Sequence, residues 1–311
     1  MKKIFVTIRI IVILAMCLTN IASAAKEINI VTTTTDLMDL VKMVGGKRVK
    51  VVSLSHGDQS GCAGVEPRPS MVIYLRSADM LVRIGMDYDH WADSLIDASR
   101  NSKIVYGANG YVDVSVGINR LEVPKGKVDA SMGHIHLYGN PHYWLDPHNA
   151  KVITKNIYEG LCRISPKNSN CFKENRDEFL LKIDMAIQEW SKKLKIFQGK
   201  KFVSYHTSWV YFAKCFGLNI VGTLEPKSGI PPSPAHLRGL IKMMKKEGIS
   251  MILHENYYPQ RTTEMVSKET GAKILILPVS VGGLNGKIED YFSLFNYIVN
   301  KITEKESKNC E

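Results

Sequence analysis

The chain has 311 residues, of which 45% are hydrophobic and 23% are charged, and its formal net charge is +11 at pH 7. This length favours two domains over one. The basic residues are dispersed, with no basic stripe interleaved with aromatic side chains, so a nucleic-acid partner is not expected. A solvated, lysine-rich face explains the charge better.

The first 24 residues (1–24) have the pattern of a secretory signal peptide. Three basic residues precede the apolar run 10–16, and the segment 22–24 is Ala-Ser-Ala, the small-residue pattern of a cleavage site. The apolar run is shorter than the ~20 residues that a membrane-spanning helix needs. We therefore expect cleavage and a periplasmic mature protein. Lipoprotein anchoring through Cys17 is the weaker alternative, because Met16 stands where a small residue is expected.

The N-terminal half alternates between strand and helix patterns. A helical pattern follows the first β-prone segment, and Gly45-Gly46 ends it. Four segments are predicted to form strands: 27–35, 49–54, 80–84 and 103–105. Alternation of this kind is typical of a parallel α/β sheet.

The clearest helix is predicted at 168–198. Apolar residues such as Phe179, Ile183 and Trp190 recur there mostly every three or four positions, which makes one apolar stripe over roughly seven turns. Strand patterns resume afterwards at 202–205, 219–221, 250–253 and 273–277.

These patterns predict the α/β fold class. We expect two Rossmann-like α/β lobes, 25–167 and 199–311, joined by one long backbone helix, 168–198. Ligands of open α/β sheets bind beyond the carboxyl ends of the strands. A metal site is therefore expected in the interlobe cleft, on loops that directly follow strands.

Histidines are concentrated in one segment. Four of the nine lie between positions 134 and 148, where 139–147 contains His142, His136 precedes it and His148 follows it. Neutral imidazole suits zinc, nickel and copper, and a carboxylate such as Asp146 could hold a ligating ring in one tautomer. By composition alone, an ordinary polar surface loop is an equally good interpretation.

Two further donors follow predicted strands. His206 stands where the strand 202–205 ends and a helix begins, so it would face the cleft, although a core or capping histidine is the alternative. Glu255 follows the strand 250–253 and offers a carboxylate.

Six motifs occur in an order that is specific as a set. They are the threonine-rich strand 31–35, Val44-Gly45-Gly46, the segment 66–70 (Glu-Pro-Arg-Pro-Ser), the segment 77–82, the segment 141–147 (Pro-His-Tyr-Trp-Leu-Asp-Pro) and the segment 205–218. Together they span essentially the whole mature chain, which resembles the solute-binding proteins of zinc and manganese ABC importers. The resemblance implies two lobes around a backbone helix, His142 and His206 as metal ligands, and an ABC importer permease with its ATPase as partner.

The chain departs from that family where the first histidine ligand is expected. Aligned without a gap, Ala63 replaces the histidine; with Gly64 as an insertion, Cys62 does. A thiolate binds zinc at ~2.3 Å and also favours Cu⁺, so Cys62 is preferred. His56 and His136 are the substitutes.

The family's carboxylate ligand also has no counterpart, because the segment 278–283 contains no acid. Water, or Glu255 from the neighbouring loop, would complete the site. Zinc tolerates three protein ligands plus water, whereas manganese prefers more oxygen donors. The nitrogen-rich set favours Zn²⁺, with Mn²⁺ and Cu⁺ as alternatives.

We therefore expect a monomeric, periplasmic metal-capture protein that serves an ABC importer and is not an enzyme. A metal-dependent hydrolase is one alternative, because three ligands plus water also describes catalytic zinc, but no hydrolase motif is present. A metal-binding adhesin or metallochaperone is the other. Among the cysteines, Cys162 and Cys171 could form a disulfide, and Cys215 is expected to be buried.

Overall fold

The computed structural model describes residues 27–59, 65–126 and 136–304. The expected signal peptide, including Cys17, and the candidate ligand Cys62 lie outside these residues. Within the described part, no helix is both long and apolar enough to cross a bilayer.

The N-terminal lobe is built on a parallel four-stranded sheet with the order β2-β1-β3-β4. Its strands are β1 (Ile28–Thr32), β2 (Val49–Ser53), β3 (Met80–Arg83) and β4 (Tyr111–Asp113). Its helices are α2 (Thr35–Gly45), α3 (Pro69–Ser77), α4 (Asp93–Ser99) and α5 (Asn149–Ile164). Because successive strand residues face opposite sides, Ile30 packs in the core under α2 and α5, whereas Val31 packs with α3 and α4.

The C-terminal lobe repeats this arrangement with the strand order β6-β5-β7-β8. Its strands are β5 (Lys201–Ser204), β6 (Asn219–Thr223), β7 (Met251–Glu255) and β8 (Lys273–Leu277). Its helices are α7 (Val210–Phe216), α8 (Pro234–Glu247), α9 (Arg261–Thr270), α10 (Gly283–Gly286) and α11 (Tyr291–Thr303). Phe202 faces the core with α7 and α11, and Val203 faces α8.

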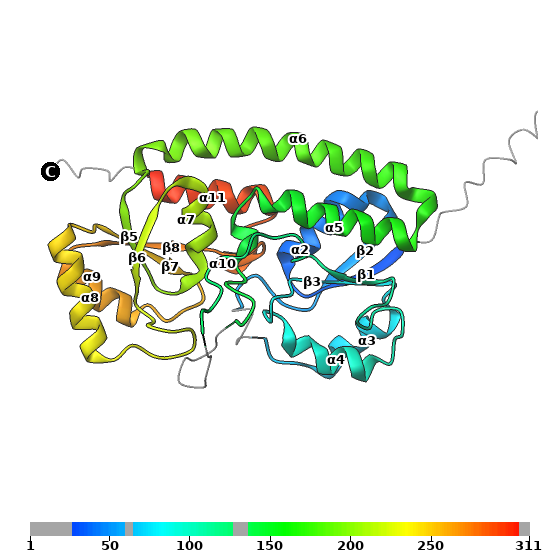
Figure 1. The fold of residues 1–311 in the computed structure, drawn as a ribbon, viewed down its shortest axis with the longest axis horizontal. Helices are drawn as coiled ribbons and strands as arrows, with labels where there is room; N and C mark the ends of the chain where they lie inside the picture. Colours follow the sequence, from blue (N-terminus) through cyan, green and yellow to red (C-terminus); the bar gives the residue numbers. More distant parts are fainter. Residues whose placement is uncertain (1–26, 60–64, 127–135, 305–311) are drawn as a thin grey trace, which may run out of the picture.

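Helix α6 (Ser169–Leu194) runs along both lobes on the side opposite α3, α4, α8 and α9 (Figure 1). Its buried stripe includes Phe172 and Phe179, and Trp190 stacks on Phe295 of α11 with ring centroids 4.8 Å apart. At the other end, Asn175 donates to the carbonyl of Val44 in α2. The predicted fold, two α/β lobes joined by one long helix, is confirmed. Short 3-10 turns occupy Gly46–Arg48, His90–Ala92, Tyr143–Leu145 (η5), Pro166–Asn168, Lys195–Phe197 and Thr207–Trp209 (η8).

The lobes also share one hydrophobic core below the cleft. Trp144 is fully buried, and its indole N–H donates to the carbonyl of Val279 in the other lobe, at 2.8 Å. Asp36, at the start of α2, accepts a 2.9 Å hydrogen bond from the backbone N–H of Val281. Burial raises the pKa of Asp36 to about 7. A carboxyl group that resists ionisation thus lies at the junction of the lobes.

Two local predictions were wrong. The segment 103–105 is not a strand; Ile104 is buried within a turn in which Gly110 N–H donates to the Lys103 carbonyl, and the strand forms at β4 instead. Cys162 and Cys171 are free thiols. Each lies on its own helix beside a polar neighbour one turn away, so the two are not joined.

Candidate metal centre

A cavity of about 380 Å³ opens between the lobes. His142 and His206 both line it, one from each lobe, and His136 lies at its edge. His206 follows β5 by two residues, so it sits at the carboxyl end of a central strand, where ligands of α/β sheets bind. The two rings are neighbours, with centroids 5.4 Å apart and planes at 75°. The remaining lining comes from Glu122, Pro124, Lys125, Gly139, Asn140, Pro141, Thr207, Lys227 and Ser228.

The ring of His142 is held by Asn140. The amide oxygen of Asn140 accepts from both the backbone N–H and ring Nδ1 of His142, each at 3.0 Å. The amide nitrogen of Asn140 donates to Glu122 and to the Thr207 carbonyl, which fixes the amide orientation. Nδ1 of His142 therefore carries the proton, and Nε2 keeps a lone pair.

His142 is also held in its neutral form. Its side chain is buried, and burial lowers its pKa well below the usual value; the neighbouring His206 and His136 act in the same direction. A neutral imidazole is the form that binds a metal ion. The site therefore does not need to lose a proton from His142 before an ion binds.

The ring of His206 is held by a carboxylate. Its Nδ1 makes a short contact with Glu225 Oε2, and Oε1 of the same carboxylate accepts from Gly229 N–H at 2.7 Å. Both side chains are buried. Because a carboxylate accepts the Nδ1 proton, the lone pair of His206 is on Nε2.

Glu255 ends β7 and is fully buried, and neither of its carboxylate oxygens makes a hydrogen bond of full geometry among the described residues, although the Ser208 side chain and the His206 backbone lie near enough to lower its pKa. Burial raises its pKa to about 7, and the nearby His206 is the main influence in the opposite direction. A buried carboxylate without partners is costly unless a proton or a cation neutralises it. Glu255 is thus a group that a bound cation would stabilise.

The other predicted donors are placed differently. His136 borders the cavity, but His56 is exposed and is not part of its lining; the backbone N–H of His56 donates to Gln59. Cys62 lies outside the described residues. Asp146 holds the ring of His148, whereas Asn140 holds His142.

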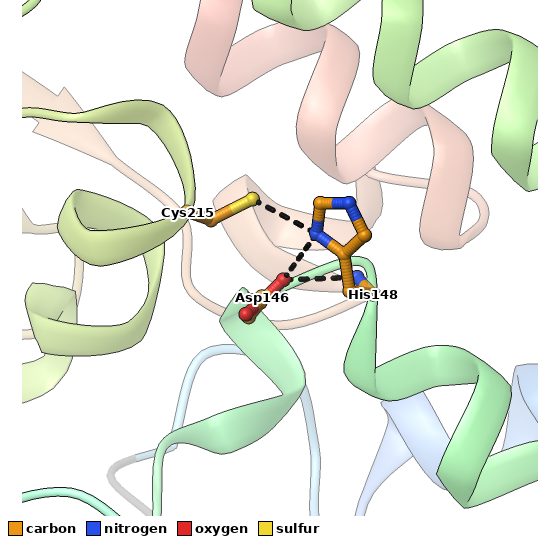
Figure 2. A group of neighbouring side chains, drawn as sticks. All are labelled: Asp146, His148 and Cys215. Atoms are coloured by element: carbon orange, nitrogen blue, oxygen red, sulfur yellow. Dashed lines mark hydrogen bonds and ion pairs between the residues drawn. The ribbon is translucent and has the colours of Figure 1, made fainter. Parts of the chain in front are cut away.

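Sequence reasoning missed the supporting residues Asn140 and Glu225. Asn140 is two positions from His142 and could have been found as a local partner, whereas Glu225 is 19 residues from His206 and only the fold brings them together. Reasoning from sequence also missed that the Cys215 side chain lies beside those of Asp146 and His148 (Figure 2).

Asp146, His148 and Cys215 have ligand atoms that all lie within 4.8 Å of one another. No other group of three or more His, Cys, Asp or Glu residues does so in residues 27–59, 65–126 and 136–304. His142 and His206 line the cavity, whereas Glu255 is buried near His206 and is not part of the lining. The ligand atoms of these three residues are therefore not all within 4.8 Å of one another. An ion bound by all three would have to draw them together.

Comparisons with known proteins agree with this two-lobed arrangement. Residues 30–305 match the family model described as Zinc-uptake complex component A periplasmic (ZnuA). The chain is 23% identical over 295 residues to the iron-binding protein YfeA of Yersinia pestis, covering 93% of this chain and 90% of that protein. It is 22% identical over 325 residues to the manganese ABC transporter substrate-binding lipoprotein PsaA of Streptococcus mitis, covering 99% of this chain and 100% of that one. The crystal structure of ZnuA has a TM-score of 0.75 at 24% identity, over 89% of this chain and 98% of that chain; at this identity, the likeness shows the fold.

Proposed function

Since the chain belongs to the zinc-uptake component A family of metal-binding ABC-transporter substrate-binding proteins, we propose that it captures Zn²⁺ in its interlobe cavity. We propose that it delivers the ion, as a periplasmic monomer, to an importer permease with its ATPase. The family consists of transport proteins rather than enzymes. The observation that carries the proposal is the pair of buried imidazoles, His142 and His206, each with its Nε2 lone pair free.

The donor types favour zinc over the metals named for the two relatives. Two imidazole nitrogens, one carboxylate oxygen and one thiolate make a four-coordinate set that suits Zn²⁺, whereas Mn²⁺ prefers more oxygen ligands. Support for Glu255 as a third ligand comes from its fully buried carboxylate near His206, which no hydrogen bond of full geometry satisfies in the described part of the chain. Cys62 of the N-terminal lobe is proposed as the fourth donor.

The experiment that tests this function is a comparison of metals on the mature chain. We expect one Zn²⁺ in the cleft of each chain and, in competition titrations, a zinc affinity at least ~10-fold above that for Mn²⁺ or Fe²⁺. Tighter binding of Mn²⁺ than of Zn²⁺ would overturn the assignment of zinc while leaving metal capture intact. Failure to stimulate zinc uptake by the importer reconstituted with the chain would overturn delivery.

Replacing Glu225 by glutamine is expected to weaken zinc binding by ~10–100-fold, the usual effect of removing the partner of a ligating histidine. The change removes the negative charge that fixes the proton on His206 Nδ1. A chelator-competition titration measures the affinity. Glu247→Gln, at a surface ion pair with Lys201, is the matched control and should leave the affinity unchanged. Equal affinities of wild type and Glu225→Gln would show that this carboxylate does not support a ligand.

Glu255→Gln separates a ligand from a merely buried acid. If Glu255 binds the ion, the variant loses zinc affinity by ~10-fold or more, yet its metal-free form becomes more stable above pH 7, because no charge is then buried. Zinc titration and urea unfolding of the metal-free proteins measure the two effects. A gain in stability without a loss of affinity would exclude Glu255 as a ligand.

A further inference from the structure

Asp146, His148 and Cys215 form a compact group outside the cavity lining (Figure 2). Nδ1 of His148 lies 3.0 Å from Asp146 Oδ1 and 3.3 Å from Cys215 Sγ. The same carboxylate oxygen also accepts the backbone N–H of His148 at 2.9 Å, which fixes the carboxylate against the ring. One nitrogen, one oxygen and one sulfur therefore lie within 4.8 Å of one another.

These distances are close to those that a tetrahedral metal ion imposes. Zinc bonds of about 2.0–2.3 Å at tetrahedral angles place neighbouring ligand atoms roughly 3.3–3.6 Å apart. The separations of His148 Nδ1 from Asp146 Oδ1 and from Cys215 Sγ need an expansion of only a few tenths of an ångström, and the oxygen and the sulfur lie within 4.8 Å of each other. Cysteine, histidine and aspartate are all zinc ligands, and water can take the fourth position. The His148 side chain is about half exposed (54%), so an ion can reach the group from solvent.

We propose that Asp146, His148 and Cys215 form a second transition-metal site, which takes a borderline ion such as Zn²⁺ and is distinct from the cleft. The carboxylate, the Nδ1 lone pair and the thiolate are its protein ligands. Burial, together with Asp146, raises the pKa of the Cys215 thiol, so without metal the sulfur keeps its proton. When the ion binds, the thiol proton passes to solvent, and His148 takes the tautomer protonated at Nε2.

This site joins the two lobes. Asp146 and His148 lie between η5 and α5 of the N-terminal lobe, and Cys215 lies on α7 of the C-terminal lobe. The turn η5 separates Asp146 from His142 of the cleft, while η8 and most of α7 separate Cys215 from His206. An ion held here would fix the spacing of the segments that carry the cleft histidines.

Co²⁺ is the probe for the test, because a cobalt–thiolate bond gives a near-ultraviolet charge-transfer band. The chain that carries His142→Ala, His206→Ala and Cys62→Ser lacks both proposed cleft imidazoles and the thiolate proposed to join them. Under reducing conditions this chain is expected to bind one Co²⁺ and to show the band. Adding Cys215→Ser should abolish the band, adding His148→Ala should weaken binding by ~10-fold or more, and adding Cys162→Ser should change nothing.

Absence of the band from the triple variant, or its persistence after Cys215→Ser, would overturn the second site. Circular dichroism checks that each variant is folded. A further measurement uses the otherwise unchanged chain: zinc content after gel filtration should fall by one ion per chain with Cys215→Ser, and an unchanged content would also overturn the proposal. Loss of the cleft ion alone would leave the cobalt band in place, so failure of the proposed function and failure of this site give different results.

Discussion

His142→Ala is expected to lower the zinc affinity of the cleft by more than ~100-fold, because loss of a ligand should exceed the ~10–100-fold cost of losing a ligand's supporting partner. The neutral ring is already oriented by Asn140, and, besides the partner ligand His206, only His136 offers another imidazole in the described lining. Chelator competition in a Cys215→Ser background measures the cleft alone.

The control for this prediction is His90→Ala. His90 is an exposed histidine in a 3-10 turn, and its ring contacts the Asp87 carbonyl. Its removal should leave zinc affinity unchanged. A His142→Ala chain that binds zinc as tightly as the His90→Ala chain would contradict the assignment of His142 as a ligand.

We expect the effect of Asp36→Asn on the free energy of unfolding of the metal-free protein to be roughly 2–4 kcal/mol more favourable at pH 8 than at pH 4, since each unit of pKa is worth about 1.4 kcal/mol. The pKa of Asp36 is raised to about 7 by burial. The native state thus holds a proton that the unfolded chain releases near the usual pKa of 3.8. This contribution is fully present below pH 3.8 and is lost as the pH rises through 7.

Urea unfolding of wild type and Asp36→Asn between pH 4 and pH 8 measures the difference. The amide that this substitution introduces keeps an oxygen that can accept from the Val281 N–H, so the hydrogen bond between the lobes is retained. Asp97→Asn, which replaces an exposed acid on α4 and keeps Asp36, is the control and should follow the wild type over this range. A constant stability difference between wild type and Asp36→Asn over this range would contradict the buried neutral carboxyl group.

The fold was predictable because periodicity reports burial directly. The stripe on α6 and the buried strands of both sheets depend on residues that each element contributes by itself, so sequence alone located them. The prediction of a strand at 103–105 failed because a single buried residue, Ile104, is compatible with a turn as well as with a strand.

The candidate site was only half predictable for a related reason. Position after a strand indicated His206, and the family motif indicated His142, but the partners of the two rings depend on the tertiary arrangement. Asp146 is only four residues from His142, yet after the turn η5 it contacts His148, which Cys215 also contacts. Spacing along the chain does not tell which way a side chain points after a tight turn.

Helix α6 also governs how quickly a captured ion could leave. It has 26 residues, hence a length of roughly 39 Å, and contains neither Gly nor Pro, so it can bend only gently. A rigid helix packed on both lobes limits the spontaneous opening of the lobes to small rotations. The bound ion would then stay long in the free chain and leave quickly once a partner separates the lobes. The dissociation rate of the ion, more than its equilibrium affinity, would therefore distinguish storage from delivery.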